Sequence, residues 1–283
     1  MSTRNTFTVG ATVILGLALV AGCGGGGSGG SGGSSGGAGS VRELIFPTGV
    51  KGGSPRFSPD GTLLAYVRDN GTTTELAVMS VTGTDSRSLA SDGNYLTAMT
   101  WTANGAEILY YGDNGIRAVP VGGGSGRFVV NAFAAVGPDL SPDGNTLAYG
   151  MNGGMMQLTD LTQSPAVENA LAVAGSSPRF SPDGATIAFW GDDKIRLMNV
   201  TTKVVTDVLD STNSFGGVDW FADGQRLLAG TERGIEVVTL GPPVTRTLLR
   251  DVFALMDVDL SPDSKSVAYS INGQHSLFVL SGF

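Results

Sequence analysis

Short apolar stretches recur along residues 41–283, and polar turn residues separate them. The pattern is clearest in "RFSPDGTLLAY" and "RFSPDGATIAF", which begin at Arg56 and Arg179. In each, an apolar residue precedes a Ser-Pro-Asp-Gly turn, and an alternating apolar strand follows it. Proline presets φ at its turn position, and glycine takes the left-handed conformation that closes the hairpin. The pattern therefore predicts two antiparallel strands joined by a tight turn.

The same unit recurs along the chain with drift. Its turn residue falls at Gly61, Gly105, Gly144, Gly184, Gly224 and Ser264, with spacings of 44, 39, 40, 40 and 40 residues. After each second strand comes a third, such as "ELAVMSV", and in all but the last unit a more polar fourth follows. A period near forty residues with four short strands in each unit is typical of a propeller blade. The sequence therefore predicts an all-β fold, a six-bladed β-propeller with four-stranded blades.

The two ends of the repeat predict how the ring closes. The last unit stops after its third strand, "SLFVL", and has no outer strand of its own. The segment 41–46, "VRELIF", precedes the first turn unit as an outer strand would. We expect this segment to complete the sixth blade and so to remove a free sheet edge.

The motif F-S-P-D-G-x-x-[LI]-A-[YF] is similar to the TolB-like propeller repeat, a distant relative of the Trp-Asp repeats. The resemblance covers 41–283, and four of the six units match it closely. It implies the propeller fold and leaves the function open. TolB carries a further N-terminal domain, so its role in the cell envelope does not transfer to this chain.

The N-terminal residues predict export and anchoring. Arg4 is the only charge before an apolar run at 7–20, which has the length of a signal-peptide core. The run leads into "LVAGC", which resembles a bacterial lipobox and ends at Cys23, the only cysteine. We therefore predict a lipoprotein signal peptide at 1–22 and, at 23–40, an acylated cysteine with a Gly/Ser-rich tether. The alternative is an ordinary signal peptide with an incidental cysteine.

The charge of the chain limits its partners. It has 17 basic and 25 acidic residues and a net charge of −8. An acidic surface argues against nucleic acid and against direct binding to anionic lipid. With the predicted signal peptide and lipid, we expect an extracytoplasmic monomer. It should contact the bacterial cell membrane or outer membrane through its lipid only.

The aspartates of the repeated turns do not predict catalysis. They are Asp60, Asp143, Asp183, Asp223 and Asp263. A residue at the same turn position in nearly every blade is explained by the turn itself, because aspartate caps such turns. His275 is the only histidine, so its count excludes a histidine-based metal site, and it lies in a predicted hairpin. No catalytic residue and no cofactor are predicted.

A calcium site is left open by acidic residues near the hairpins between second and third strands. These residues are Asp69, Asp113, Asp192, Asp193 and Glu232. Oxygen ligands suit calcium, but aspartate beside Asn-Gly is ordinary turn chemistry. We favour the turn interpretation and predict no metal site.

The residue before each inner-strand anchor forms a candidate channel ring. Its members are Arg56, Thr100, Asp139, Arg179, Asp219 and Asp259. The anchors themselves should pack between blades, so alternation turns these neighbours the other way. Blade order places Asp259 beside Arg56, and Arg179 between Asp139 and Asp219. The ring is either an internal set of ion pairs or a ligand site.

A candidate ligand face lies opposite the Ser-Pro-Asp-Gly turns, where the period breaks. Its candidate residues are Tyr95, Phe133, Phe215, Phe253, Asp113, Asp192, Asp193 and His275. Aromatic rings with scattered carboxylates suit a sugar or a peptide. We predict a non-catalytic binding or scaffolding module for a protein, peptide or glycan of the cell envelope. The alternative is a hydrolase or lyase that acts on sugars or peptides with carboxylates at the channel mouth.

Overall fold

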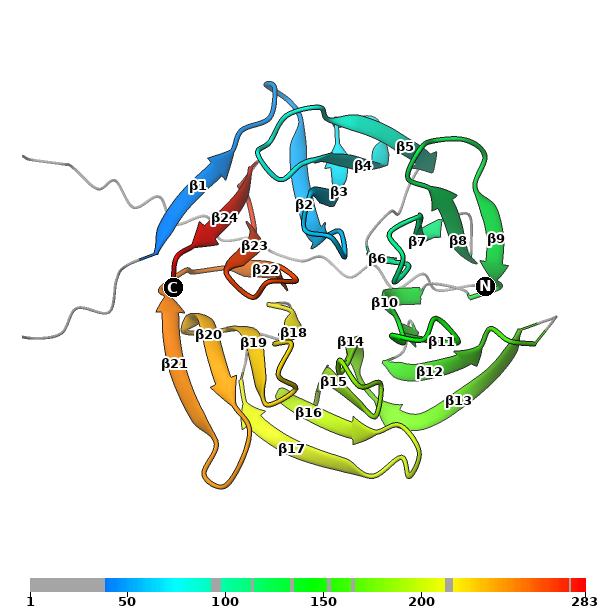
Figure 1. Ribbon diagram of the computed structural model, residues 1–283, viewed down its shortest axis with the longest axis vertical. Helices are drawn as coiled ribbons and strands as arrows, with labels where there is room; N and C mark the ends of the chain where they lie inside the picture. The colour runs from blue at the N-terminus through cyan, green and yellow to red at the C-terminus, as the bar shows by residue number, and fades with distance from the viewer. Residues whose placement is uncertain are drawn as a thin grey trace, which may run out of the picture. The chain divides into compact units, whose positions relative to one another are not determined.

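The described residues form 24 strands in six antiparallel four-stranded sheets, arranged around a common axis (Figure 1). The computed structural model describes residues 39–92, 98–112, 115–132, 135–151, 154–163, 166–211, 216–274 and 276–283. No helix occurs among them, and so none that is long and apolar enough to cross a membrane. The predicted six-bladed, all-β propeller is confirmed.

Each blade runs from an inner strand near the axis to an outer strand at the rim. Blade 1 comprises β2 (Lys51–Phe57), β3 (Leu63–Asp69), β4 (Thr74–Ser80) and β5 (Arg87–Asp92). Blade 2 comprises β6 (Met99–Trp101), β7 (Glu107–Gly112), β8 (Gly115–Pro120) and β9 (Arg127–Val130). Blade 3 comprises β10 (Ala135–Leu140), β11 (Thr146–Met151), β12 (Met155–Asp160) and β13 (Val167–Ala174).

The second half of the ring repeats this order. Blade 4 comprises β14 (Ser176–Phe180), β15 (Thr186–Gly191), β16 (Lys194–Asn199) and β17 (Val205–Asp210). Blade 5 comprises β18 (Val218–Trp220), β19 (Arg226–Thr231), β20 (Gly234–Thr239) and β21 (Thr245–Arg250). Blade 6 comprises β22 (Leu255–Leu260), β23 (Ser266–Ile271) and β24 (Leu277–Ser281), with β1 (Ser40–Leu44) as its outer strand.

The Ser-Pro-Asp-Gly turns are held by hydrogen bonds within each turn. In blade 1 the Ser58 hydroxyl donates to Asp60 Oδ1 at 2.6 Å, and the Thr62 backbone N–H donates to the same oxygen at 3.0 Å. These bonds hold the pKa of Asp60 below its usual range. Gly61 has φ of 72°, and Ser264 takes the same left-handed conformation at 59° in blade 6. The aspartates thus serve the shape of the turn.

The N-terminal strand closes the ring, as the sequence predicts. β1 pairs antiparallel with β24, from Ser40 opposite Ser281 to Leu44 opposite Leu277, and the two strands lie side by side in Figure 1. The predicted strand 41–46 is displaced, because Ile45 and Phe46 follow the end of β1. The Phe46 ring instead packs on Tyr66 of blade 1, with the ring centroids 5.2 Å apart.

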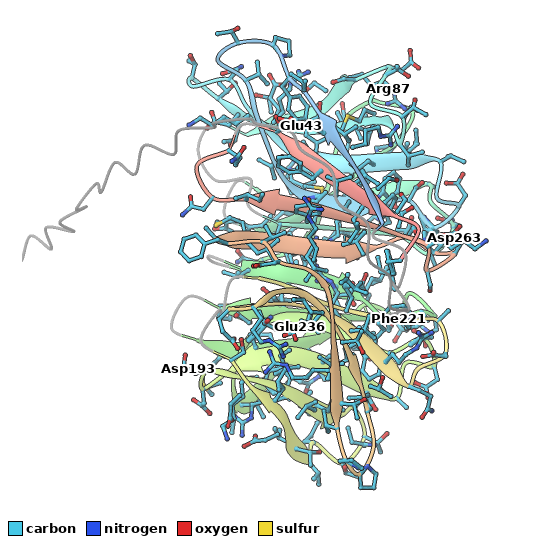
Figure 2. The ribbon with its side chains drawn as sticks, turned by 90° about the vertical axis from the view of Figure 1, so that its left-hand side faces the viewer. Glu43, Arg87, Asp193, Phe221, Glu236 and Asp263 are labelled. Carbon is cyan, nitrogen blue, oxygen red and sulfur yellow. The ribbon has the colours of Figure 1, made fainter. Side chains whose placement is uncertain are left out.

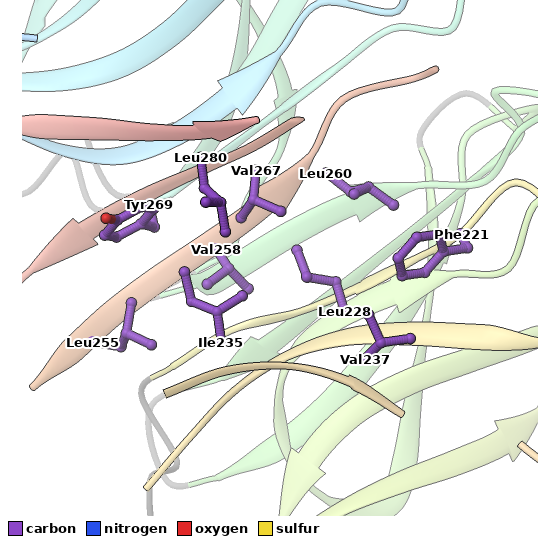
Figure 3. Close-up of a cluster of buried hydrophobic side chains, with 10 residues drawn as sticks. All are labelled: Phe221, Leu228, Ile235, Val237, Leu255, Val258, Leu260, Val267, Tyr269 and Leu280. Atoms are coloured by element: carbon purple, nitrogen blue, oxygen red, sulfur yellow. The ribbon is translucent and has the colours of Figure 1, made fainter. Parts of the chain in front are cut away.

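Apolar side chains fill the space between neighbouring blades and form the core. Figure 3 shows the cluster between blades 5 and 6, made of Phe221, Leu228, Ile235, Val237, Leu255, Val258, Leu260, Val267, Tyr269 and Leu280. The predicted anchors Phe57, Trp101, Phe180, Trp220 and Leu260 are buried, and Leu140 is partly buried. The side chains of the neighbouring blades therefore cover both faces of each sheet near the axis, as expected for a propeller.

The strand directions define two faces of the propeller. We call the turn face the side that holds the connections between first and second strands, such as 58–62. We call the loop face the opposite side, which holds the connections between second and third strands and between blades. Asp193 lies on the loop face, whereas Asp263 lies on the turn face (Figure 2). Ser40 lies at the turn-face end of β1, because it pairs with Ser281, which pairs with Ser266.

Candidate functional site

The structure brings the six residues of the channel ring together. They line one cavity of about 200 Å³ between the inner strands, namely Arg56, Thr100, Asp139, Arg179, Asp219 and Asp259. Other walls come from Ala103, Ser141 and Pro142, which belong to or border the turns of blades 2 and 3. The cavity therefore lies at the turn-face end of the channel.

A repeated irregularity in the inner strands aims the arginines into the channel. The pairing register shifts just before Arg56 and just before Arg179. In both strands a serine with positive φ precedes a proline, with φ of 49° at Ser54 and 51° at Ser177. Such a bulge bends the strand and redirects the side chain that follows it. Each arginine Nη1 then donates to the carbonyl oxygen of the proline before it, at 2.7 Å for Arg56 and 2.9 Å for Arg179.

The three aspartates of the ring each join two neighbouring blades. Each one accepts a hydrogen bond from the backbone N–H of the next blade's anchor: Asp139 from Phe180 (2.8 Å), Asp219 from Leu260 (2.8 Å) and Asp259 from Phe57 (2.7 Å). Thr100 adds a bond from its hydroxyl to Asp139 Oδ1 at 3.1 Å. The carboxylates thus satisfy backbone donors that would otherwise be buried without partners.

Where the ring residue is arginine, the next blade uses a tryptophan instead. The indole N–H of Trp101 donates to the carbonyl oxygen of Arg56 at 3.2 Å. The indole N–H of Trp220 likewise donates to the carbonyl oxygen of Arg179 at 3.0 Å. With the aspartate bonds, at least one hydrogen bond from a ring or anchor residue crosses every blade interface. The ring is therefore a structural girdle as well as a cavity lining.

Arg56 pairs with two carboxylates of blade 6 in the channel. Its guanidinium lies 2.9 Å from Asp257 Oδ2 and 3.7 Å from Asp259 Oδ1. Burial acts to lower the pKa of Arg56, but the charges of Asp257 and Asp259 outweigh it and raise that pKa. Burial, and then the charge of Asp219, raise the pKa of Asp259 to about 8. Burial thus favours the protonated form of Asp259 more than it would favour that form in an exposed aspartate.

Two acidic groups that pair with arginines were not identified from the sequence. Asp257 lies two residues before Asp259, on the same side of the strand, and alternation could have indicated it. Glu236 is fully buried in β20, where it accepts from Thr231 at 2.6 Å and pairs with Arg246 and with Arg233 at 3.0 Å. The sequence offers one signal for Glu236, which is a charged residue in an otherwise apolar strand.

On the loop face, the structure describes three of the eight predicted residues. Phe253 is 89% exposed in the connection between blades 5 and 6. Asp192 and Asp193 form a hairpin turn with φ of 54° and 56°, and Asp192 accepts from Arg196 Nη1 at 2.6 Å. These two aspartates serve the turn. The remaining five, Tyr95, Asp113, Phe133, Phe215 and His275, lie outside the described residues, as does Cys23.

The described part of the chain contains no group of three or more His, Cys, Asp or Glu side chains arranged to hold a metal ion. Asp69, Asp192, Asp193 and Glu232, the described members of the possible calcium set, lie on separate hairpins in blades 1, 4 and 5. Asp69 accepts the Gly71 backbone N–H at 2.7 Å, as a turn aspartate does.

The sequence matches no protein-family model and no curated protein. The solved structures that are similar in fold include two WD40-type β-propellers. One is a chain of the mitotic checkpoint complex, with 14% identity over 95% of this chain and 98% of that chain, and a TM-score of 0.63. The other is the β-propeller domain of Cps50 (Swd1) from Myceliophteria thermophila, with 16% identity over 85% of each chain and a TM-score of 0.62. At these identities the similarity shows the fold alone.

Proposed function

We propose that the chain is a lipid-anchored, extracytoplasmic binding module that docks a protein partner on its loop face. The exposed apolar side chains of that face support the proposal most directly. They are Ile45, Val136, Met155, Phe253 and Met256, with Ile45 at 79% and Phe253 at 89% exposure. Each lies at a loop-face strand end or in a connection on that side. The turn face and the rim also carry exposed apolar side chains, namely Phe128, Val204, Val244, Leu248 and Phe283, but the two most exposed, Ile45 and Phe253, lie on the loop face. Exposed apolar groups of this kind favour a protein contact.

The direction of β1 also favours the loop face. Ser40 lies at the turn-face end of this strand, so the described chain enters the propeller at the turn face. A membrane attachment through Cys23 would therefore leave the loop face accessible to a partner. One of the similar structures belongs to the mitotic checkpoint complex, so that propeller acts within a protein assembly. This precedent supports a protein partner at the level of the fold.

Photo-crosslinking tests the docking face. A photoreactive phenylalanine analogue in place of Phe253 is expected to crosslink one defined protein in cells. The same analogue in place of Val244, which is 39% exposed in a turn-face connection, is the matched control. Phe253→Asp should abolish the interaction without lowering the melting temperature, because the ring contacts solvent. Equal crosslinking from both positions, or an interaction that survives Phe253→Asp, would refute the assigned face.

Fractionation tests the anchor. If Cys23 is acylated, Cys23→Ala is expected to move the protein from the membrane fraction to the soluble fraction. A single acyl chain binds a membrane only marginally, so the full modification is needed for stable anchoring. The propeller should melt at the same temperature, because Cys23 lies outside it. Retention of the Cys23→Ala protein on membranes in high salt would exclude the lipid as the anchor.

The alternative, a hydrolase or lyase, would draw on the channel carboxylates. Asp219 accepts backbone N–H groups on both oxygens, from Trp220 at 2.8 Å and from Leu260 at 2.8 Å. Asp139 is similarly occupied by Thr100 and Phe180. These bonds give the carboxylates a structural role, and we therefore favour the binding module.

A further inference from the structure

Arg56 and Arg179 occupy equivalent positions on opposite sides of the channel. They belong to blades 1 and 4 of a six-bladed ring, and each follows a serine–proline bulge. Both are 6% exposed, and both donate from Nη1 to the preceding proline carbonyl. The two sites can therefore be compared as two versions of one local structure.

The two arginines differ in the partners that the preceding blade supplies. Arg56 is paired with Asp257 of blade 6 at 2.9 Å. The equivalent residue before Arg179 is Gly137 in blade 3, two positions before Asp139 just as Asp257 is two before Asp259. Among the described residues the Arg179 side chain makes only its bond to Pro178, and no carboxylate lies within ion-pair distance. A guanidinium has five N–H donors, so most of those of Arg179 are free beside the cavity.

Acceptors are also present in this cavity, but they do not reach Arg179. Asp139 and Asp219 come from the blades on either side of Arg179, and their charges interact with it at longer range. Each of their oxygens already accepts one hydrogen bond and keeps a second lone pair. A separated donor and acceptor can be joined by a group that both accepts and donates. A hydroxyl does this, whereas a carboxylate only accepts and an ammonium only donates.

Charge also selects a neutral ligand. A bound anion would lie between the carboxylates of Asp139 and Asp219, and a bound cation would face the Arg179 guanidinium. The cavity of about 200 Å³ has apolar walls from Phe57, Trp101 and Leu140. At about 30 Å³ per water molecule it has space for roughly six or seven waters, or for one sugar ring in their place.

We propose that this turn-face cavity binds a single neutral sugar unit, with a hydroxyl of the ring bridging Arg179 to the carboxylates of Asp139 and Asp219. The aromatic walls contact the apolar face of the ring. The site is separate from the partner surface on the loop face, so either can exist without the other. The sugar is either a free monosaccharide or the terminal unit of a glycan.

Ligand-observed NMR on the purified full-length protein tests the site, in a detergent without a sugar headgroup. The probes are glucose, galactose, mannose and N-acetylglucosamine, each with its methyl glycoside, and the charged analogues glucuronate and glucosamine. At least one neutral sugar is expected to bind, at least tenfold more tightly than the charged analogues. Binding of the free sugar alone identifies a monosaccharide site, whereas equal binding of the methyl glycoside identifies a terminal glycan unit. Either result supports the proposal.

Two pairs of variants locate the binding. Arg179→Lys keeps the charge but loses the planar donor set, and it should weaken binding at least tenfold, whereas Arg226→Lys on the same face should not. Ala103→Trp should block the cavity from an exposed turn position, whereas Ala222→Trp, at the equivalent turn of blade 5, should have no effect. Ala103→Trp and Ala222→Trp leave the buried ring residues unchanged, so this comparison does not require a ring variant to fold. Failure of every neutral sugar to bind at millimolar concentration, tighter binding of a charged analogue, or binding unchanged in Arg179→Lys and Ala103→Trp would overturn the proposal.

Discussion

Removal of the closing strand is expected to cost the propeller roughly 3–5 kcal/mol of unfolding free energy. Five residue pairs join β1 to β24, and Leu44 packs in the cluster with Phe57, Met79 and Leu277. Burial of one leucine contributes about 1.5–3 kcal/mol, and we count each backbone hydrogen bond of this outer strand at the low end of the usual range, about 0.5 kcal/mol. The Arg42 guanidinium also donates to the carbonyl oxygen of Val81 in blade 1. The strand therefore stabilises both blade 6 and its contact with blade 1.

Calorimetry of two shortened chains measures this contribution. One chain begins at residue 39 and keeps β1, and the other begins at residue 45 and lacks it. For a domain of this size, 1 kcal/mol corresponds to about 2–4 °C, so the second chain should melt roughly 10 °C lower. Equal melting temperatures would mean that β1 contributes nothing to the closed ring.

Arg56→Met is expected to cost about 3–5 kcal/mol at pH 8, the usual cost of removing one partner of a buried ion pair. Asp257 and Asp259 would then lie in the channel without their cation. Arg179→Met is the matched control, because Arg179 has the same bulge and burial but makes no ion pair at contact distance. We expect the control to cost clearly less, as measured by urea unfolding.

The same experiment at different pH values tests the charge balance of the ring. The pKa of Asp259 is raised from 3.8 to about 8 in the folded protein, chiefly by burial. The folded state therefore binds more protons than the unfolded state between these values. This contribution to stability is full below about pH 4 and is lost as pH rises towards 8, by at most about 1.4 kcal/mol per pH unit for one proton.

Loss of the Arg56 charge should extend this decline to higher pH, because that charge lowers the pKa of Asp259. The Arg56→Met protein should therefore recover part of its stability at pH 5. Asp259→Asn in the wild-type background should flatten the decline between pH 5 and pH 8. A cost of Arg56→Met that is the same at pH 5 and pH 8 would contradict the described pairing.

The fold could be predicted from the sequence because each blade repeats the same local solution. Proline, aspartate and glycine at fixed turn positions set the hairpin, and their spacing sets the blade count without any tertiary information. The closing strand was also predictable, because the last repeat unit has no outer strand of its own and an additional strand precedes the first unit. Its bounds were less certain, since Phe46 is as apolar as a strand residue but packs on Tyr66 instead.

The candidate site was predicted only in part, because its pairings depend on distances between blades. Blade order correctly placed Asp259 beside Arg56. It placed Arg179 between two aspartates, but it could not show that they stop short of contact. Alternation could have indicated Asp257, whereas its 2.9 Å approach to Arg56 depends on how the bulges turn the strands.

One rule that links sequence to structure emerges only after the hydrogen bonds are known. An aspartate at the ring position accepts from the next blade's backbone, so the next anchor can be phenylalanine or leucine. An arginine has no acceptor in its side chain, so its carbonyl oxygen serves instead and the next blade supplies an indole N–H. Trp101 follows Arg56 and Trp220 follows Arg179 in this way. The tryptophans were recognised from the sequence as anchors but not as donors.

The pairing of the first described strand with the last also fixes an order of assembly. Blades 1 to 5 are each built from consecutive residues, so each can form as soon as its own segment has been synthesised. Blade 6 must wait until β24 is available, because β1 has no other partner in the ring. Bringing together two strands so far apart in the chain is slow, since the loop between them must first be closed. We therefore expect completion of the ring to be the last folding event, and we expect Leu44 and the open edge of β24 to be exposed to aggregation and to proteases until then.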